Sequence, residues 1–211
     1  MKKLFIALFT VALMPLLANA AKYEEGKHYQ VIPGAATNKS EVREYFSYYC
    51  PACRSFEAYV GEITKSLPAE TKLKKTHVTF MGQSSPEIQF MLSKGLVVAE
   101  KTGLGKQFNA EAFSYIQTKR EIITSEADVR KIYVAAGGDG AKFDKGMKSF
   151  SLVSQAKRNE KIQKKLSQGR YVKSVPSFVV NGKYAINSKE LDSNNFVEDY
   201  KNIIAYLLTL K

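Results

Sequence analysis

The pattern of apolar and polar residues divides the chain into strand-like and helical parts. A run of aromatic and apolar residues at positions 41–49, EVREYFSYY, predicts a buried strand. After Pro51, apolar side chains recur three or four positions apart, which predicts a helix that closes at Pro68. Residues 73–81, LKKTHVTFM, predict a second strand. The order strand, helix, strand favours a parallel pair with a right-handed crossover.

The middle of the chain has a different periodicity. From residue 87 to about residue 165 the apolar spacing is helical, with glycine-rich breaks, and it ends in one long basic helix at about residues 152–167. Strand-like residues return at Ser177–Val180, and the dipeptide Asn181-Gly182 predicts a tight hairpin turn into a return strand. A last amphipathic helix closes the chain. The pattern therefore predicts an α/β fold with a helical insertion.

These elements give a domain organisation. We expect residues 21–82 and 166–211 to form one α/β domain. Residues 83–165 then form an inserted helical subdomain that includes the long connecting helix. About 190 residues are enough to bury a sizeable core.

The N-terminus has the composition of an export signal. Two lysines precede an apolar run at residues 4–17, and Ala18-Asn19-Ala20 follows as an A-x-A cleavage site. We therefore expect residues 1–20 to be a signal peptide, cleaved near Ala20. The run is short for a membrane span, although an uncleaved anchor is the alternative. Export places the protein in an oxidising compartment, most simply the periplasm.

The chain is strongly basic, with a formal net charge of +12 at pH 7. Its lysines are scattered along the sequence instead of concentrated in one arm, and export also argues against a nucleic-acid partner. In such a chain, scattered positive charge most often lies on a solvent-exposed face. A preference for acidic substrates or for membrane surfaces stays open.

The chemistry centres on the only two cysteines in 211 residues, Cys50 and Cys53, which form a C-x-x-C pair. As a staple, so short a loop would stabilise the fold by only about 2 kcal/mol, against ~4.7 for a loop of a hundred residues. A structural zinc site needs four ligands, and only two distant histidines, His28 and His77, could add to the pair. We therefore expect no metal here and predict dithiol/disulfide exchange.

The predicted position of the pair assigns the two sulfurs different roles. Cys50 lies where a strand ends and a helix begins, so its sulfur should face free backbone N–H groups and the positive end of the helix dipole, which favours a thiolate. Cys53 lies one turn into the helix and should be more buried, as the resolving thiol. His77 is expected to be a structural histidine instead of a base.

Four segments together resemble a known family: AKYEEGKHYQV, EYFSYYCPACRSFE, HVTFMG and SVPSFVVNGKY, in this order and with the helical insert before the last. The chain resembles the DsbA group of periplasmic thiol:disulfide oxidoreductases, which have the thioredoxin fold. The resemblance implies a dithiol oxidase that introduces disulfides into reduced, unfolded exported polypeptides. It implies no cofactor beyond the Cys50–Cys53 disulfide, a monomer, and a DsbB-like, quinone-linked partner in the inner membrane that restores it.

The resemblance also implies site residues. The Val175-Pro176 bond is expected to be cis and to lie beside the cysteine pair, where these two residues, with Pro51 and Ala52, would offer substrates an apolar surface. Histidine is common in the family at the position of Ala52. The two residues between the cysteines, Pro51 and Ala52, are expected to tune the redox potential. Because alanine neither donates a hydrogen bond nor adds charge, we expect a less oxidising pair than in typical members of the family.

A buried acid is expected beneath the cysteine pair. By strand alternation Glu44 shares the side of Val42 and Phe46, although a water-facing edge acid is the alternative. In the family pattern a lysine on the adjacent strand pairs with this acid, and Lys75 matches that place. The pair would relay protons during exchange or serve only as a structural ion pair.

Competing functions remain at this point. Within enzymes, the chain could be a disulfide reductase or isomerase, or a specialised paralogue with few substrates. From another class, it could be a redox-inert peptide-binding chaperone whose cysteines brace the start of a helix.

Overall fold

The computed structural model describes residues 22–210, so the signal peptide predicted at residues 1–20 lies outside the described residues. One five-stranded mixed sheet has the strand order β1-β5-β4-β2-β3. Strands β2 (Glu41–Phe46) and β3 (Lys72–His77) are parallel and are connected by helix α1 (Pro51–Ser66), as the pattern predicts. All other neighbouring strands are antiparallel.

The remaining elements follow the chain in three groups. The other strands are β1 (Tyr29–Val31), β4 (Ser177–Val180) and β5 (Tyr184–Ile186). The helices between β3 and β4 are α2 (Pro86–Lys101), α3 (Gly105–Phe113), α4 (Glu126–Ala135), α5 (Gly140–Lys148) and α6 (Phe150–Gln168), with a π-helical turn at Ser114–Thr118. Two short 3-10 turns, Ser188–Glu190 and Ser193–Asn195, lead into the last helix, α7 (Phe196–Thr209).

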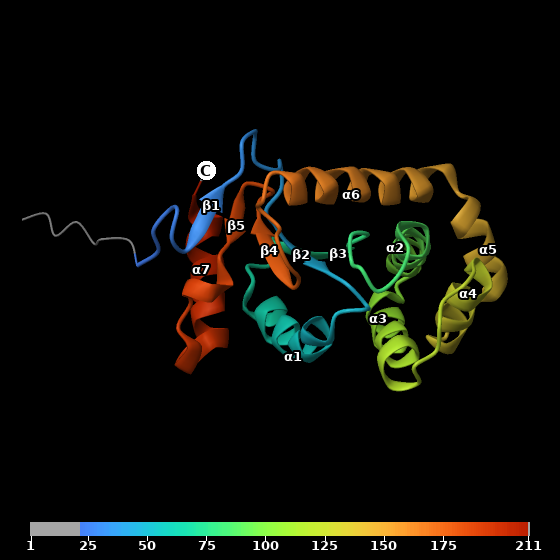
Figure 1. Cartoon of the computed structure of the whole chain (residues 1–211). Helices are drawn as coiled ribbons and strands as arrows, with labels where there is room; N and C mark the ends of the chain where they lie inside the picture. The colour runs from blue at the N-terminus through green and yellow to red at the C-terminus, as the bar shows by residue number, and fades with distance from the viewer. Residues whose placement is uncertain (1–21, 211) are drawn as a thin grey trace, which may run out of the picture.

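The sheet is covered on both faces. Helices α1 and α7 pack together on one face, where their apolar stripes meet side chains of β2 and β4 around the fully buried Ile63 and Ile203. The C-terminal part of α6 covers the other face, where Leu166 packs against Tyr45 and Val179. Helices α2 to α5 stand beside this α/β unit, and α6 runs back from them to the sheet (Figure 1). The predicted α/β fold with a helical insertion is confirmed.

The helical part and the sheet share a continuous core at the end of β2. The buried residues Phe46, Tyr48, Cys50 and Cys53 belong to the same apolar cluster as the inward-facing side chains of α2 to α5. The cysteine pair therefore lies at the junction of the two parts. No helix among residues 22–210 is long and apolar enough to cross a membrane.

Two strands end earlier in the structure than the sequence predicts. The first ends at Phe46 instead of residue 49, because the backbone turns at Ser47, whose carbonyl and hydroxyl oxygens accept from the N–H groups of Cys50 and Tyr49. The second ends at His77 instead of residue 81. Past that point, side-chain amides of α6 and α2 replace strand partners and bind the N–H groups of Thr79 and Met81.

The predicted hairpin turn is confirmed, and one strand was not predicted. Asn181 and Gly182 both have positive φ angles, 52° and 63°, as a tight turn between β4 and β5 requires. Strand β1 has only three residues, too few to show a period, and it pairs in an antiparallel register with β5. This edge strand places the N-terminal segment beside the last helix, whose Asp199 accepts a hydrogen bond from the Tyr23 hydroxyl at 2.6 Å.

Candidate active site

Helix α1 begins at Cys50. The backbone of Cys50 is extended (φ −98°, ψ 111°), and its Sγ accepts a hydrogen bond from the Cys53 N–H at 3.2 Å, as an N-cap oxygen would. Pro51 occupies the first turn, where a missing N–H costs nothing. The sulfur thus faces the positive end of the helix, an environment that favours negative charge.

Cys53 is the less accessible of the two sulfurs, as expected from its position one turn into the helix. Its exposed fraction is 0%, against 6% for Cys50, and both are free thiols in the structure. Burial raises the pKa of the Cys53 thiol well above its ordinary value, and the hydrogen bond with Cys50 raises it further. Cys53 is therefore held as a protonated, protected thiol, and Cys50 is the accessible end of the pair.

A loop from the far end of the chain completes the surroundings of Cys50. The Val175-Pro176 bond is cis, as the resemblance implies. The Cys50 thiol donates to the carbonyl oxygen of Val175 at 3.4 Å, so residues 125 positions apart meet at the reactive sulfur. This backbone contact leaves the side chains of Pro51 and Ala52 exposed on the helix side of the pair.

Glu44, Lys75 and Glu57 form an ionic cluster near the cysteines, where the charge of Glu44 acts on Cys53. Its inner end, Glu44, is buried, and its outer end, Glu57, has a side chain that is 32% exposed. Glu44 is fully buried, which excludes the water-facing alternative, and it lies opposite Lys75 in the parallel register of β2 and β3. The Lys75 ammonium group contacts Glu44 Oε2 and lies 2.6 Å from Glu57 Oε1. It also lies 4.5 Å from the centre of the Phe46 ring, a cation–π contact. The sequence-predicted pair is thus present, with a third member from α1.

The cluster perturbs the ionisation of its members. Burial raises the pKa of Glu44 to about 7, even though Lys75 acts in the opposite direction. For Lys75, burial favours the neutral amine, but Glu44 and Glu57 outweigh it and raise the pKa. Glu44 Oε1 has no hydrogen-bond partner among the described residues, which adds to the cost of its charge. Glu44 therefore changes its charge near neutral pH, close to the redox pair.

Replacing Glu44 with glutamine should change how stability depends on pH. Because its folded pKa of about 7 exceeds the ordinary 4.5, the folded chain binds more protons between these values, and the contribution of Glu44 to the free energy of unfolding falls as pH rises. Over this window the difference amounts to at most about 3 kcal/mol. Desolvation raises the pKa of Glu100 to about 7 as well, so both proteins lose stability between pH 5 and pH 8. In urea unfolding the loss should be smaller in Glu44→Gln than in the wild type, by the contribution of Glu44. The same pH slope in both proteins would contradict the assignment.

Gln117, which lies in the π-helical turn, is a site residue that the sequence did not indicate. Its side-chain amide donates to the carbonyl oxygens of Tyr48 at 2.7 Å and Cys50 at 3.1 Å. One amide group of the helical insert therefore holds two carbonyl groups of the segment that leads into Cys50. Single π-helical turns are rare and are frequent at functional sites. Nothing in the local sequence distinguishes Gln117 from a solvent-facing glutamine.

Replacing Gln117 with leucine or with glutamate should loosen this segment. Both variants are close to glutamine in size and neither donates to the two carbonyl groups, so about 1–3 kcal/mol of unfolding free energy should be lost. Exchange of a dithiol peptide should slow in both variants. Gln117→Asn, which keeps the amide, is the matched control for recovery of rate. Wild-type stability and rate in Gln117→Leu would contradict a positioning role.

His77 is buried in an aromatic environment, as its predicted structural role requires. Its ring stacks on Tyr48 with centroids 4.8 Å apart, and its Nδ1 lies 3.2 Å from the hydroxyl group of Ser93. Burial lowers the pKa of His77 to about 3, so the ring is neutral at physiological pH. The ring packs against Tyr48 in the segment before Cys50, and its 2% exposure leaves it almost closed to solvent.

Comparisons with known proteins agree with this geometry. Residues 27–204 match the model of a thioredoxin family. DsbA, the thiol:disulfide interchange protein, from Salmonella typhimurium is 33% identical over 217 residues, with all of both chains covered. DsbA from Dickeya dadantii is also 33% identical over the full length of both chains.

Solved structures give the same result. DsbA from Klebsiella pneumoniae is 30% identical, with a TM-score of 0.75 over 90% of this chain and 99% of its own. A variant of Proteus mirabilis DsbA with a non-covalently bound peptide is 25% identical, with a TM-score of 0.76 over 89% of this chain and 99% of its own. The thioredoxin fold is therefore confirmed. The chain belongs to the DsbA family of thiol:disulfide oxidoreductases.

Proposed function

We propose that this protein oxidises pairs of cysteines in exported polypeptides through its Cys50–Cys53 pair. The observation that carries the proposal is the position of Cys50. Its sulfur lies at the N-terminus of α1 and contacts the carbonyl oxygen of Val175. It is the accessible end of a pair whose second thiol is fully buried. Cys50 is 6% exposed, and the positive end of a helix is an environment in which a cysteine becomes reactive by forming a thiolate.

The reaction is an exchange of one disulfide for another. A substrate thiolate attacks the Cys50 sulfur of the oxidised protein, the Cys50–Cys53 bond breaks, and Cys53 leaves with the electron pair and takes up a proton. The second thiolate of the same substrate then attacks the substrate sulfur of the mixed disulfide and displaces the Cys50 sulfur. The substrate loses two electrons and two protons, and the protein gains them. Glu44, whose charge changes near neutral pH below Cys53, and Lys75 tune this step and supply a route for the proton.

Substrates of many sequences fit this site. The surface around the sulfur consists of the exposed Pro51 and Ala52 and the partly exposed Val175 and Pro176. These residues favour apolar contacts with a substrate without requiring one particular side chain. Backbone atoms of the loop before Pro176 supply hydrogen bonds that any extended polypeptide can use.

The cellular setting follows from the N-terminus and the redox chemistry. Residues 1–20 act as a signal peptide that is removed near Ala20, and the mature protein works in the periplasm. Each turnover leaves a dithiol, so a DsbB-like, quinone-linked partner in the inner membrane must reoxidise it. The protein works as a monomer. It needs no bound cofactor for exchange with its substrates, because the electron pair moves between sulfur atoms only.

The two parts of the chain have distinct tasks in this proposal. Residues 21–82 and 166–211 form the thioredoxin-like domain that supplies the cysteine pair and the Val175–Pro176 loop. Residues 83–165 form the helical subdomain, whose Gln117 supports the backbone of the nucleophile.

A reduction potential distinguishes this function from its alternatives. An oxidase requires a potential well above the glutathione couple, measured by equilibration with reduced and oxidised glutathione. A value far below that couple would assign the protein as a reductase. A pair that exchanges only over hours would favour the peptide-binding chaperone.

Trapping identifies what the protein acts on. With Cys53→Ala, Cys50 forms mixed disulfides that no internal thiol resolves. Mass spectrometry of the attached polypeptides after expression with the signal peptide should recover exported cysteine-containing proteins. Many such proteins indicate a general oxidase, and one or two indicate a specialised paralogue.

A further inference from the structure

A hollow of about 260 Å³ lies beside the loop that contacts Cys50, between the end of α6 and strand β5. One of its lining residues is Ser174. The next residue, Val175, is the one whose carbonyl oxygen lies 3.4 Å from the Cys50 sulfur. Consecutive Cα atoms are about 3.8 Å apart. Ser177, on the other side of the Val175-Pro176 pair, also lines the hollow, so the hollow adjoins the loop that contacts the reactive sulfur.

The charged side chains that line the hollow all carry the same sign. Arg170, Lys173 and Lys189 contribute three cations, and no aspartate or glutamate is among the lining residues. Among residues 22–210, none of the three forms an ion pair, whereas lysines such as Lys75 and Lys94 do. The nearest acid in sequence, Glu190, does not line the hollow.

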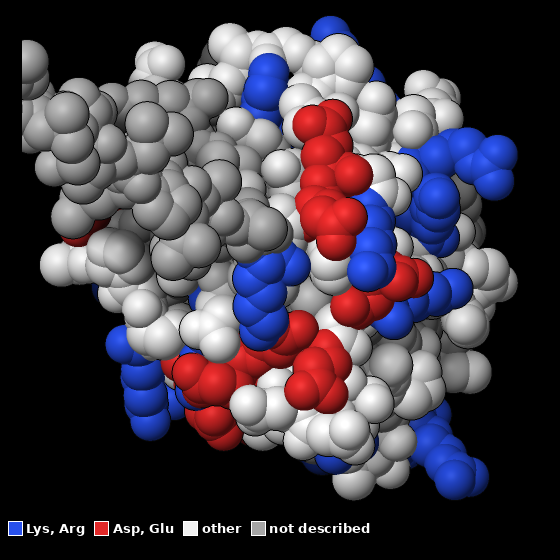
Figure 2. All heavy atoms as spheres, turned by 90° about the vertical axis from the view of Figure 1, so that its left-hand side faces the viewer, with Lys and Arg blue, Asp and Glu red and all other residues white. Residues whose placement is uncertain are grey.

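This concentration of positive charge is not simply the average of a basic surface. The face of the molecule shown in Figure 2 carries acidic and basic side chains side by side. Ion pairs in this region of the structure include Lys22 with Asp199 and Lys201 with Glu198. The three cations of the hollow, in contrast, form no ion pair with any of residues 22–210.

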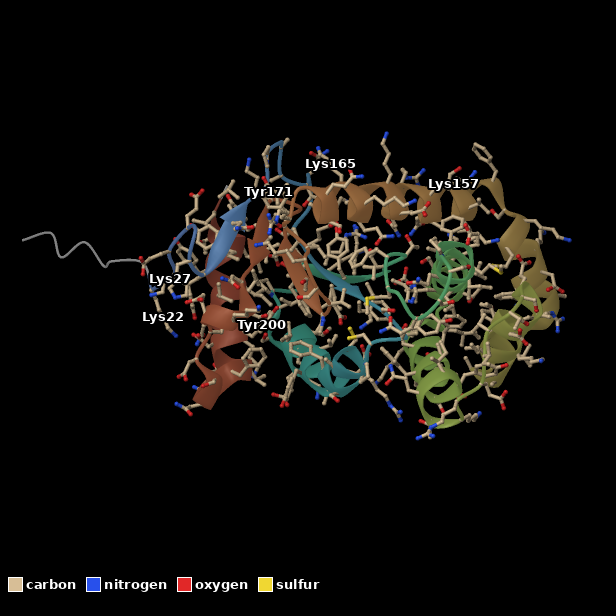
Figure 3. The ribbon with its side chains drawn as sticks, in the orientation of Figure 1. Lys22, Lys27, Lys157, Lys165, Tyr171 and Tyr200 are labelled. Carbon is tan, nitrogen blue, oxygen red and sulfur yellow. The ribbon has the colours of Figure 1, made fainter. Side chains whose placement is uncertain are left out.

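The backbone of Arg170 is in the left-handed region, with φ 62°, directly after the end of α6. Figure 3 shows that this end of the helix, marked by Tyr171, is the one beside the sheet. The turn is closed by hydrogen bonds from Arg170 N–H to Ser167 O at 3.0 Å and from Tyr171 N–H to Leu166 O at 2.9 Å. A non-glycine residue costs roughly 1 kcal/mol in this conformation. Glycine would avoid that cost but would remove the guanidinium group from the hollow.

The size and chemistry of the hollow select its ligand. Pockets for drug-sized molecules are roughly 300–1,000 Å³, so 260 Å³ suits a side chain better than a free cofactor. The lining is mainly polar, and a guanidinium group binds a carboxylate through two parallel hydrogen bonds. A carboxylate is the side-chain group that matches the three cations of the hollow.

We propose that this hollow binds an acidic side chain of the substrate polypeptide, close in sequence to the reacting cysteine. Acidic dithiol substrates are then oxidised faster than neutral ones. The inference rests on the proposed dithiol oxidase function and leaves its electron balance unchanged. Two substrate thiols become a disulfide as the Cys50–Cys53 disulfide becomes a dithiol, and the hollow takes part only in binding.

Three synthetic peptides test the preference. They share two reduced cysteines and differ only at flanking positions, which carry glutamate, glutamine or lysine. Oxidation by the oxidised protein is followed by quenched flow and chromatography of the peptide disulfide. The acidic peptide should react about tenfold faster than the neutral one, the low end of electrostatic steering in charged clefts. At about 1 M salt, where the Debye length is about 3 Å, the ratio should approach one.

Two triple variants with the same change in net charge locate the effect. One replaces the cations of the hollow with glutamate: Arg170, Lys173 and Lys189. The other replaces with glutamate three exposed lysines of the helical part that do not line this hollow and form no ion pair among the described residues: Lys106, Lys142 and Lys145. The ratio of acidic to neutral rates should be lost or inverted in the first and should persist in the second. Lys173→Gln, a single milder change, keeps the test valid if the first triple variant does not fold, and it should lower the ratio.

Each other outcome is decisive. Equal rates for the acidic and neutral peptides in the wild type overturn the inference and leave the oxidase function standing. Equal loss of preference in both triple variants overturns it as well, because net charge alone then explains the effect. Failure of the wild type to oxidise any of the peptides overturns the proposed function itself.

Discussion

Cys50→Ser should reduce dithiol oxidation to the uncatalysed rate while leaving the fold intact. The serine hydroxyl is a favoured helix N-cap and can accept from the Cys53 N–H as the sulfur does at 3.2 Å, so α1 keeps its start. The variant has no sulfur at the accessible end of the pair, and the remaining thiol is fully buried. Oxidation of a dithiol peptide and far-ultraviolet circular dichroism are the two measurements.

Cys53→Ser is the matched control for this prediction. It removes the same number of sulfur atoms but keeps the accessible one, so it should form a mixed disulfide with an activated small disulfide, whereas Cys50→Ser should not. Mass spectrometry of the two proteins distinguishes them directly. Equal labelling of both variants, or residual turnover in Cys50→Ser, would contradict the assignment of Cys50 as the nucleophile.

The parts of the fold that the sequence predicted are those with local causes. The i, i+3, i+4 spacing after Pro51 is enough to define α1, because such an apolar stripe must be buried, whichever element of the fold buries it. Asn181-Gly182 defines the turn between β4 and β5, since both residues tolerate positive φ. Alternation along β2 placed Glu44 on a buried side because a strand has a period of two.

The parts that the sequence did not predict depend on distant partners. Tyr48 and Tyr49 extend the aromatic run of β2, yet they leave the strand and pack against the helical part. That outcome depends on helices that begin dozens of residues later. Likewise Thr79 leaves the sheet because a side-chain amide of Gln163 binds its N–H group. A run of β-favouring residues contains no information about such a competitor.

Among site residues, the same distinction separates Glu57 from Gln117. Glu57 follows Cys53 by four positions and therefore lies on the same face of α1, so helical spacing could have indicated it as the third member of the Glu44–Lys75 cluster. Gln117 is 67 residues from the carbonyl group of Cys50 that it binds, and no spacing rule connects them. The sequence predicted the chemistry of the pair, and the structure adds the groups that hold it in place.

Ala52→His should make the protein a stronger oxidant, raising its reduction potential by about 30–60 mV. Ala52 is exposed in the first turn of α1 beside Cys50 and offers no donor or charge. A histidine there would donate to the thiolate of the reduced form, and a hydrogen bond to a charged group contributes about 1.5–3 kcal/mol, where 30 mV corresponds to about 1.4 kcal/mol. Stabilising the reduced form relative to the disulfide makes the disulfide more oxidising.

Ala52→Phe separates this hydrogen bond from a simple effect of size. Phenylalanine fills about as much space as histidine over the exposed start of α1, but it neither donates a hydrogen bond nor carries charge. The reduction potential of Ala52→Phe should therefore stay near that of the wild type. Equilibration of all three proteins with glutathione gives the potentials on one scale. An unchanged potential in Ala52→His, or the same rise in Ala52→Phe, would show that the residue between the cysteines acts through something other than a hydrogen bond to Cys50. With the expected result, Ala52 is a position that limits the reduction potential of this chain, because it offers the Cys50 thiolate no hydrogen bond.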